Sequence, residues 1–137
     1  MIDGRKHEVR SIEELIEALH PVESLALGSD DFEASLMELR LMKSNISAVL
    51  SFTRYSLGKG QAEDAELHAL LDDVRSRCLG INAMISRAIF RQRWLFKVSK
   101  LEESCEILRN YREMAEAARC LCLRLSPESG NQLRHAF

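Results

Sequence analysis

The chain has 137 residues, of which 46% are hydrophobic and 29% are charged, a composition typical of one globular domain. This composition excludes wholesale disorder, a collagen-like chain and a membrane-embedded bundle, and the small number of glycines and prolines argues against the many turns of an all-β fold. The formal net charge is -2, so no overall field draws the protein to nucleic acid or to an anionic membrane.

Apolar periodicity along the chain predicts helices. The stretch between Pro21 and Pro127 contains no proline, and its apolar residues recur every three or four positions, as on one face of a helix. A short helix is predicted at residues 12–19, where Ser11 and Glu14 are spaced as a capping box, in which each side chain bonds the other's backbone N–H. Pro21 disfavours helical geometry at the residue before it and ends this helix.

Three long helices are predicted to follow, at residues 31–57, 62–97 and 99–125. A Gly-Lys-Gly turn at 58–60 separates the first two, and Ser99 begins a second capping box before the last one. In the first long helix the predicted core stripe is Phe32, Leu36, Leu39, Ile46, Leu50 and Leu57, widened by a second row of Met42, Val49 and Phe52.

The predicted fold is therefore all-α, an antiparallel helical bundle of three long helices plus a short N-terminal helix. The length favours a single helical domain over residues 1–137. Residues 1–10 and 126–137 carry no apolar stripe, and we expect them to be loose termini.

The least defined boundary lies between the last two predicted helices. Neither glycine nor proline separates Leu95 from Leu101, and a continuous helix over 62–125 would be too long for a monomer and would force an intertwined dimer. The capping box at Ser99 favours a break instead. Gly80, inside the preceding helix, indicates either a close helix contact or a mild kink.

Charge is distributed unevenly along the nearly neutral chain. Residues 11–39 carry eight acidic side chains and no lysine or arginine, whereas residues 78–100 carry five basic side chains and no acid. Such blocks either pair within the fold, pair across a subunit interface, or form two separate solvated faces.

Four cysteines, at positions 78, 105, 120 and 122, fall among apolar neighbours in the predicted helices. We interpret all four as reduced, buried core residues of a cytosolic protein. The first ten residues lack the apolar segment of a signal peptide, and no apolar run is long enough for a transmembrane helix. The sequence therefore predicts a cytoplasmic location and no contact with a membrane.

No residue pattern indicates catalysis or a bound cofactor. Asp64, His68 and Asp72 share one helix face, but acidic residues at the start of a helix are better explained by the helix dipole than by a metal ion. Cys120 and Cys122 point about 200° apart on a helix and do not converge on zinc. Nucleophile elbows, phosphate loops and dinucleotide fingerprints are absent from the sequence. The sequence predicts a non-enzyme with no metal and no cofactor.

The most distinctive segment is 86–100, SRAIFRQRWLFKVSK. On a helical wheel Phe90 and Trp94 lie opposite the core stripe, with basic side chains on both borders, and tryptophan and arginine are enriched at interface hot spots. The predicted interaction surface consists of Arg87, Phe90, Arg91, Arg93, Trp94 and Lys97. It can be covered by the helix at 12–19 of the same chain, by a second subunit, or by a different protein.

These observations favour a non-enzymatic helical bundle that acts through self-association and protein–protein interaction, as an adaptor, a chaperone-like protein or a regulatory module. We expect a homodimer, and a further protein partner is compatible with the same surface. The alternative is a small regulatory nucleic-acid-binding protein that uses the basic stretch 86–100. The two differ in their response to salt, because phosphate binding weakens steeply as salt rises and apolar association does not.

Overall fold

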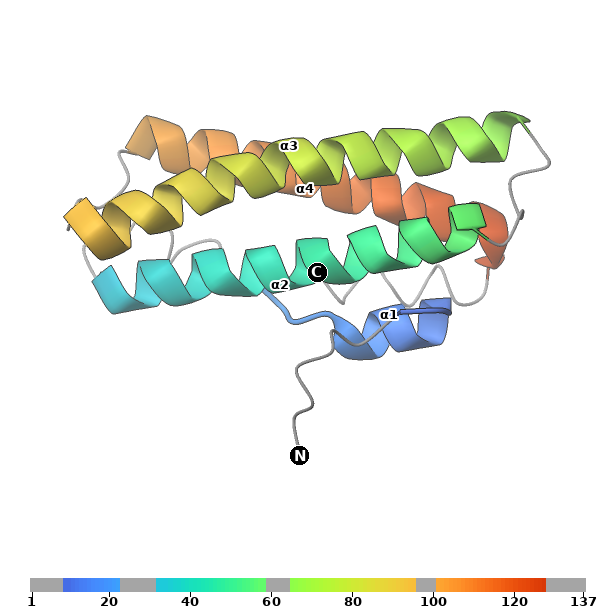
Figure 1. The fold of residues 1–137 in the computed structure, drawn as a ribbon, viewed down its shortest axis with the longest axis horizontal. Helices are drawn as coiled ribbons and strands as arrows, with labels where there is room; N and C mark the ends of the chain where they lie inside the picture. Colours follow the sequence, from blue (N-terminus) through green and yellow to red (C-terminus); the bar gives the residue numbers. More distant parts are fainter. Residues whose placement is uncertain (1–8, 23–31, 59–64, 96–100, 128–137) are drawn as a thin grey trace.

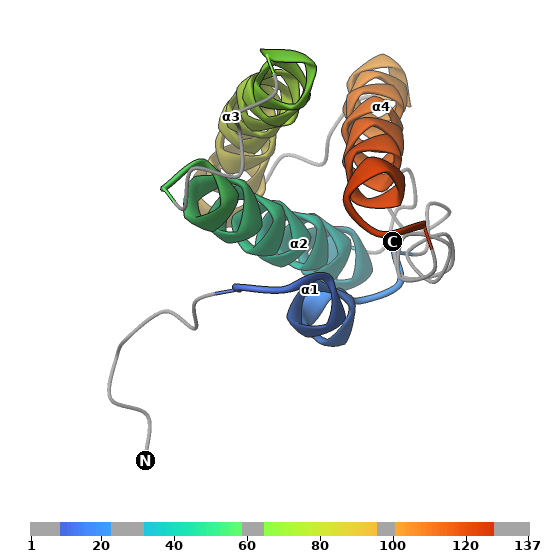
Figure 2. The same ribbon diagram turned by 90° about the vertical axis from the view of Figure 1, so that its right-hand side faces the viewer.

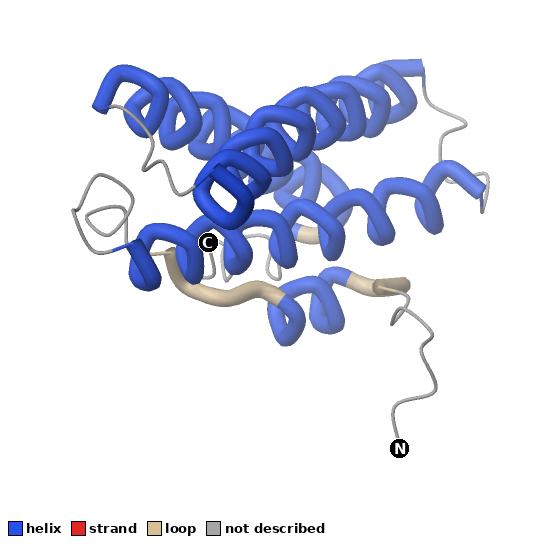
Figure 3. Tube along the Cα trace, turned by 60° about the vertical axis from the view of Figure 1, so that its left-hand side comes forward, coloured by secondary structure: helices blue, strands red, loops and turns tan. Residues whose placement is uncertain are grey.

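The computed structural model describes residues 9–22, 32–58, 65–95 and 101–127. These contain four helices: α1 (Ile12–Ala18), α2 (Phe32–Gly58), α3 (Ala65–Leu95) and α4 (Leu101–Leu125). Within these four ranges nearly every residue is helical and none lies in a strand, as Figure 3 shows. The predicted all-α class is confirmed.

The three long helices pack side by side in alternating directions (Figure 1). α2 packs along α3, and α3 packs along α4, each pair running antiparallel. The predicted antiparallel bundle is therefore confirmed, and the continuous helix over 62–125 is wrong, because α3 and α4 are separate helices that lie against each other. The 58–60 turn beyond Gly58 and the capping box at Ser99 fall outside the described residues.

The core lies where the apolar faces of all four helices meet. In α2 both predicted rows enter the core, because these five side chains are buried: Leu39 and Ile46 of the main stripe, and Met42, Val49 and Phe52 of the second row. Leu36 and Leu50, placed by the sequence in the main stripe, are only half-buried at its edge. The reason is geometric: at about 100° per residue the buried side of α2 centres near Met42 and Val49, and Leu36 and Leu50 lie a quarter turn or more away from it.

α1 is held against α2, on the side away from α3 (Figure 2). The Ser11 hydroxyl caps it by accepting a hydrogen bond from the Glu14 N–H at 3.1 Å, as predicted. The Glu14 carboxylate accepts from the N–H of Arg10 at 2.9 Å, one residue before the position that a capping box predicts. Val9, within the expected loose terminus, is buried, and its N–H donates to the Ser51 hydroxyl at 2.9 Å.

A buried amide connects three parts of the chain. Asn45 in α2 is fully buried, and its side-chain oxygen accepts from the backbone N–H of His20 at 2.8 Å. Its Nδ2 donates to the backbone carbonyl of His20 at 2.8 Å and to the Tyr111 hydroxyl of α4 at 2.7 Å. Burial raises the pKa of Tyr111 to about 12, so the phenol stays protonated at neutral pH. Asn45 thus fixes the end of α1 and the middle of α4 on α2.

The four cysteines do not share one environment. Cys78 and Cys122 are fully buried, whereas Cys105 and Cys120 are exposed on α4. The expectation of four core cysteines is therefore wrong for two of them. Residues two positions apart on a helix point about 200° apart, so the burial of Cys122 turns Cys120 outward, and the burial of Ile107 does the same to Cys105.

This split predicts a two-step reaction with a mild thiol reagent. In the folded protein Cys105 and Cys120 should react rapidly, because the reagent can reach an exposed side chain. Cys78 and Cys122 should react only on unfolding, since burial raises the pKa of each thiol to about 12. Absorbance of the released chromophore measures both steps. Rapid reaction of all four thiols in the folded protein would contradict this placement.

Gly80 makes no close helix contact, so that interpretation of the sequence is wrong. It is exposed in the interior of α3, and a Cβ atom built there would meet nothing within 4 Å. Replacing Gly80 with alanine should therefore raise the free energy of unfolding by about 0.5–1 kcal/mol, the difference in helix propensity. Urea denaturation measures the change. A loss of stability would mean that the glycine serves a backbone conformation other than that of an ordinary helix.

Candidate interaction surface

Two large apolar side chains stand out from the last turns of α3. Phe90 is 56% exposed and Trp94 is 63% exposed, and they lie one helical turn apart on the same face. The Arg93 guanidinium lies over the Trp94 ring, 5.8 Å from its centroid, which is the geometry of a cation–π contact. The sequence placed both aromatic residues opposite the core, and the structure confirms that position.

A neighbouring residue explains why the two aromatic rings point outward. Gln92, which interrupts the apolar stripe in the sequence, is fully buried, and its Nε2 donates to the Ser35 hydroxyl of α2 at 3.2 Å. Trp94, two residues further on, is turned about 200° away from it. Sequence periodicity treats Gln92 as a break in the stripe, and only its partner on α2 identifies it as a core residue.

α1 does not cover this aromatic pair. Its apolar face is buried through Ile12 and Leu15, and it packs on α2, on the side away from α3 (Figure 2). The interpretation in which the helix at 12–19 shields Trp94 is therefore wrong. The backbone bonds of His20 to Asn45 show why, because they fix the end of α1 on α2.

A groove of about 620 Å³ runs between α3 and α4 beside the aromatic pair. Its lining residues are Met84, Ser86, Arg87, Phe90, Arg91, Glu103, Glu106 and Ile107. Three of the six predicted surface residues, Arg87, Phe90 and Arg91, therefore meet in one groove. Arg91 forms an ion pair with Glu103 of α4, and both side chains line the groove. Trp94 and Arg93 lie at the end of α3, and Lys97 falls outside the described residues.

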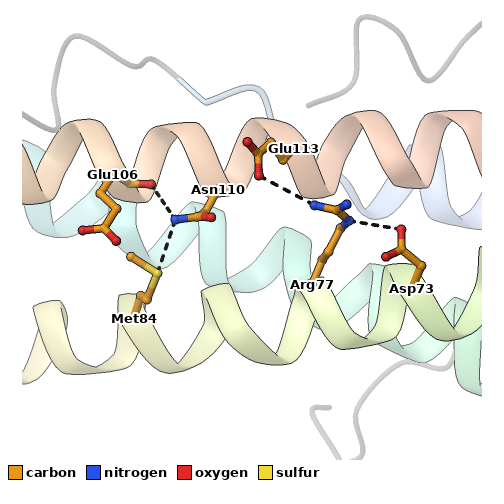
Figure 4. A network of polar contacts seen from close by, with 6 residues as sticks. All are labelled: Asp73, Arg77, Met84, Glu106, Asn110 and Glu113. Carbon is orange, nitrogen blue, oxygen red and sulfur yellow. Dashed lines mark hydrogen bonds and ion pairs between the residues drawn. The ribbon is translucent and has the colours of Figure 1, made fainter.

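Further along the same seam, polar contacts join α3 and α4 (Figure 4). Arg77 pairs with Asp73 on its own helix at 3.1 Å and with Glu113 of α4 at 3.6 Å. The Asn110 amide donates to the backbone carbonyl of Glu106 at 3.0 Å and lies 3.6 Å from the Met84 sulfur. Exposed pairs of this kind contribute about 0–1 kcal/mol each. They bridge the seam next to the groove, whose lining includes Met84 and Glu106.

The surface consists of the exposed aromatic side chains of Phe90 and Trp94, bordered by charged side chains. In the described ranges no cluster of three or more His, Cys, Asp or Glu side chains is arranged to hold a metal ion. His68 and Asp72 are both exposed to solvent, and Asp64 is outside those ranges. No helix among the described residues is both long and apolar enough to span a bilayer.

Comparison with protein-family models gives no match for this chain. Searches of curated proteins and of solved structures give no significant match either. The function is therefore inferred from the residues and the geometry of this surface.

Proposed function

We propose that the protein is a non-enzymatic, self-associating interaction module that forms a homodimer through the outer face of α3. Phe90 and Trp94 lie at the contact, and Arg87, Arg91 and Lys97 lie at its rim. The observation that carries the proposal is the exposure of two adjacent aromatic side chains, 56% and 63%, that the helices of the same chain leave uncovered. Exposed apolar patches on a folded domain mark interaction sites.

Burial of this pair would contribute to the free energy of association, which must also offset the entropy lost when two chains combine. Phenylalanine and tryptophan bury about 150–250 Å² each when they are fully covered. At about 25 cal/mol per Å², the exposed part of each ring corresponds to roughly 2–4 kcal/mol. A two-fold dimer buries both rings of both copies, so each contribution counts twice. The bordering arginines add orientation rather than affinity, since exposed charges are screened by salt.

Nucleic-acid binding by the basic stretch 86–100 is the weaker alternative. Arg91 is engaged by Glu103, and Arg93 lies over Trp94. Glu106 also lines the groove beside them, so acidic side chains would face a phosphate backbone. A protein partner of another kind suits the same apolar surface, and it would leave the isolated chain monomeric.

We assign the protein to the cytoplasm on the state of its cysteines. All four are free thiols, and two of them, Cys105 and Cys120, are exposed. Unpaired exposed thiols are typical of a reducing compartment, where glutathione keeps them reduced.

Fluorescence of the single tryptophan tests the proposal directly. Trp94 is largely exposed in one chain, so dilution of a dimer should shift its emission to longer wavelength as the ring becomes hydrated. Emission should stay nearly constant as salt rises, since apolar burial dominates. An emission maximum that does not change between the highest and lowest concentrations, at the position of a hydrated tryptophan, would contradict self-association through this face.

A further inference from the structure

The seam between α3 and α4 carries opposite charges on its two walls. Residues 74–94 of α3 include five arginines and no acid, whereas residues 103–116 of α4 include four glutamates and two arginines. The two stretches lie beside each other because the helices are adjacent and antiparallel. The ion pair of Arg77 with Glu113, at 3.6 Å, crosses the seam (Figure 4). The α3 wall is therefore basic, and the α4 wall is acidic on balance.

One level of these cross-helix pairs is open. Arg91 is paired with Glu103. Arg87 lies one turn before Arg91, and Glu106 lies one turn after Glu103, so in antiparallel helices the two side chains stand at the same level. Both are exposed and line the groove, and neither forms an ion pair with another residue in the part of the chain that the structure describes. A cation on one wall and a carboxylate on the other are thus available to a second molecule.

We propose that two copies associate face to face over this seam, with the two-fold axis parallel to the helices, so that α3 of each copy lies on α4 of the other. Arg87 then pairs with Glu106 of the second copy, and Glu106 pairs with Arg87 of the second copy. This geometry rests on the proposed self-association and specifies which helices meet.

The occupant is a second copy because the seam is complementary to itself. A two-fold axis along the seam exchanges the positions of α3 and α4 but leaves every residue at its own level. A level with a base on one wall and an acid on the other therefore meets acid with base in the second copy. Arg87 and Glu106 form such a level. So does the far end of the seam, where the signs are reversed and Glu66 of α3 pairs with Arg124 of α4.

The same arrangement covers the aromatic pair. Phe90 and Trp94 lie on either side of Arg91 along α3, and Arg91 is level with Glu103, near the start of α4. Exchange of the two walls therefore places both rings against the first turns of α4 of the second copy. Their exposure in a single chain is explained by this contact.

Contact of α3 with α3 of the second copy is disfavoured by the charges. It would bring together two stretches with five arginines each and no acid, and like charges in contact are destabilising. The acidic wall also holds a base, Arg109, near the level of Arg87. Arg109 lies three residues after Glu106 and four before Glu113, so two acids of its own helix offset its charge. Four glutamates against two arginines leave residues 103–116 with a net charge of -2.

Mixing two charge-reversed variants tests the pairing between chains. In a dimer of Arg87→Glu two carboxylates face each other at this level, and in a dimer of Glu106→Arg two guanidinium groups do. Each variant alone should therefore raise the dissociation constant about tenfold. In an equimolar mixture the mixed dimer has opposite charges at both contacts, and it should form with a dissociation constant within about threefold of the wild-type value. Sedimentation equilibrium of each variant and of the mixture measures these constants.

Arg75→Glu provides the matched control. Arg75 is also an exposed arginine of α3, but it is turned about 120° from Arg87, so the same charge reversal lies outside the contact. Its dissociation constant should match that of the wild type. Circular dichroism should show unchanged helix content in all three variants, because the replaced side chains are exposed.

Each other outcome overturns a defined claim. Wild-type affinity in Arg87→Glu and Glu106→Arg, a mixture that associates no more tightly than its components, or an equal loss in Arg75→Glu would overturn the contact of α3 with α4. These results leave self-association intact. A wild-type protein with the mass of one chain at every concentration would overturn self-association itself.

Discussion

Replacing Asn45 with alanine is expected to lower the free energy of unfolding by roughly 2–4 kcal/mol. The change removes three hydrogen bonds, two to the backbone of His20 and one to Tyr111. The Tyr111 hydroxyl is then left inside the core without this partner, and a small cavity replaces the amide. Urea denaturation followed by circular dichroism measures the effect.

The matched control for this variant is Ser47→Ala. Ser47 lies two residues further along α2 and is exposed, so its replacement should change stability by less than about 0.5 kcal/mol. Tyr111→Phe should destabilise less than Asn45→Ala, and the double variant should lose less than the two single losses together, since both remove the same bond. An Asn45→Ala protein as stable as its Ser47→Ala control would contradict the connecting role of this amide.

Replacing Trp94 with glutamate is expected to convert the dimer into a monomer, raising the dissociation constant about a hundredfold or more. The substitution removes the largest exposed apolar side chain of α3 and places a carboxylate at the centre of the contact. Helix content should be unchanged, because the side chain is 63% exposed in the single chain.

Met37→Glu provides the control for this effect. Met37 is also 63% exposed, but it belongs to α2 and is turned about 200° from Ser35, which faces α3, so its replacement introduces the same charge on another helix. Its mass in solution should match that of the wild type. Dimerisation of Trp94→Glu with wild-type affinity, or an equal loss of affinity in Met37→Glu, would show that the aromatic pair does not form the interface.

The helices and the outward position of the aromatic pair were predictable because both depend on local periodicity. The spacing of apolar residues in α3 turns Ile85 and Ala88 inward, and this leaves Phe90 and Trp94 on the opposite side whatever the other helices do. The Ser11 cap was predictable for the same reason, since its partner lies three residues away.

Features that join distant parts of the chain were not predictable from the sequence. No spacing rule connects His20, Asn45 and Tyr111, which meet only after α1, α2 and α4 have packed. This contact determines where α1 packs. Because the sequence does not reveal the contact, the amphipathic pattern of α1 was equally consistent with a position over Trp94. The burial of Gln92 likewise depends on Ser35, a residue of another helix.

Sedimentation equilibrium over a dilution series tests self-association through the outer face of α3 most directly. The chain has a mass of 15.6 kDa. At high micromolar concentration the measured mass should be twice that value, and it should fall toward 15.6 kDa on dilution. Trp94→Glu should remain a monomer at every accessible concentration, whereas Met37→Glu should dissociate at the same concentration as the wild type. A wild-type mass of 15.6 kDa at every concentration would contradict the account.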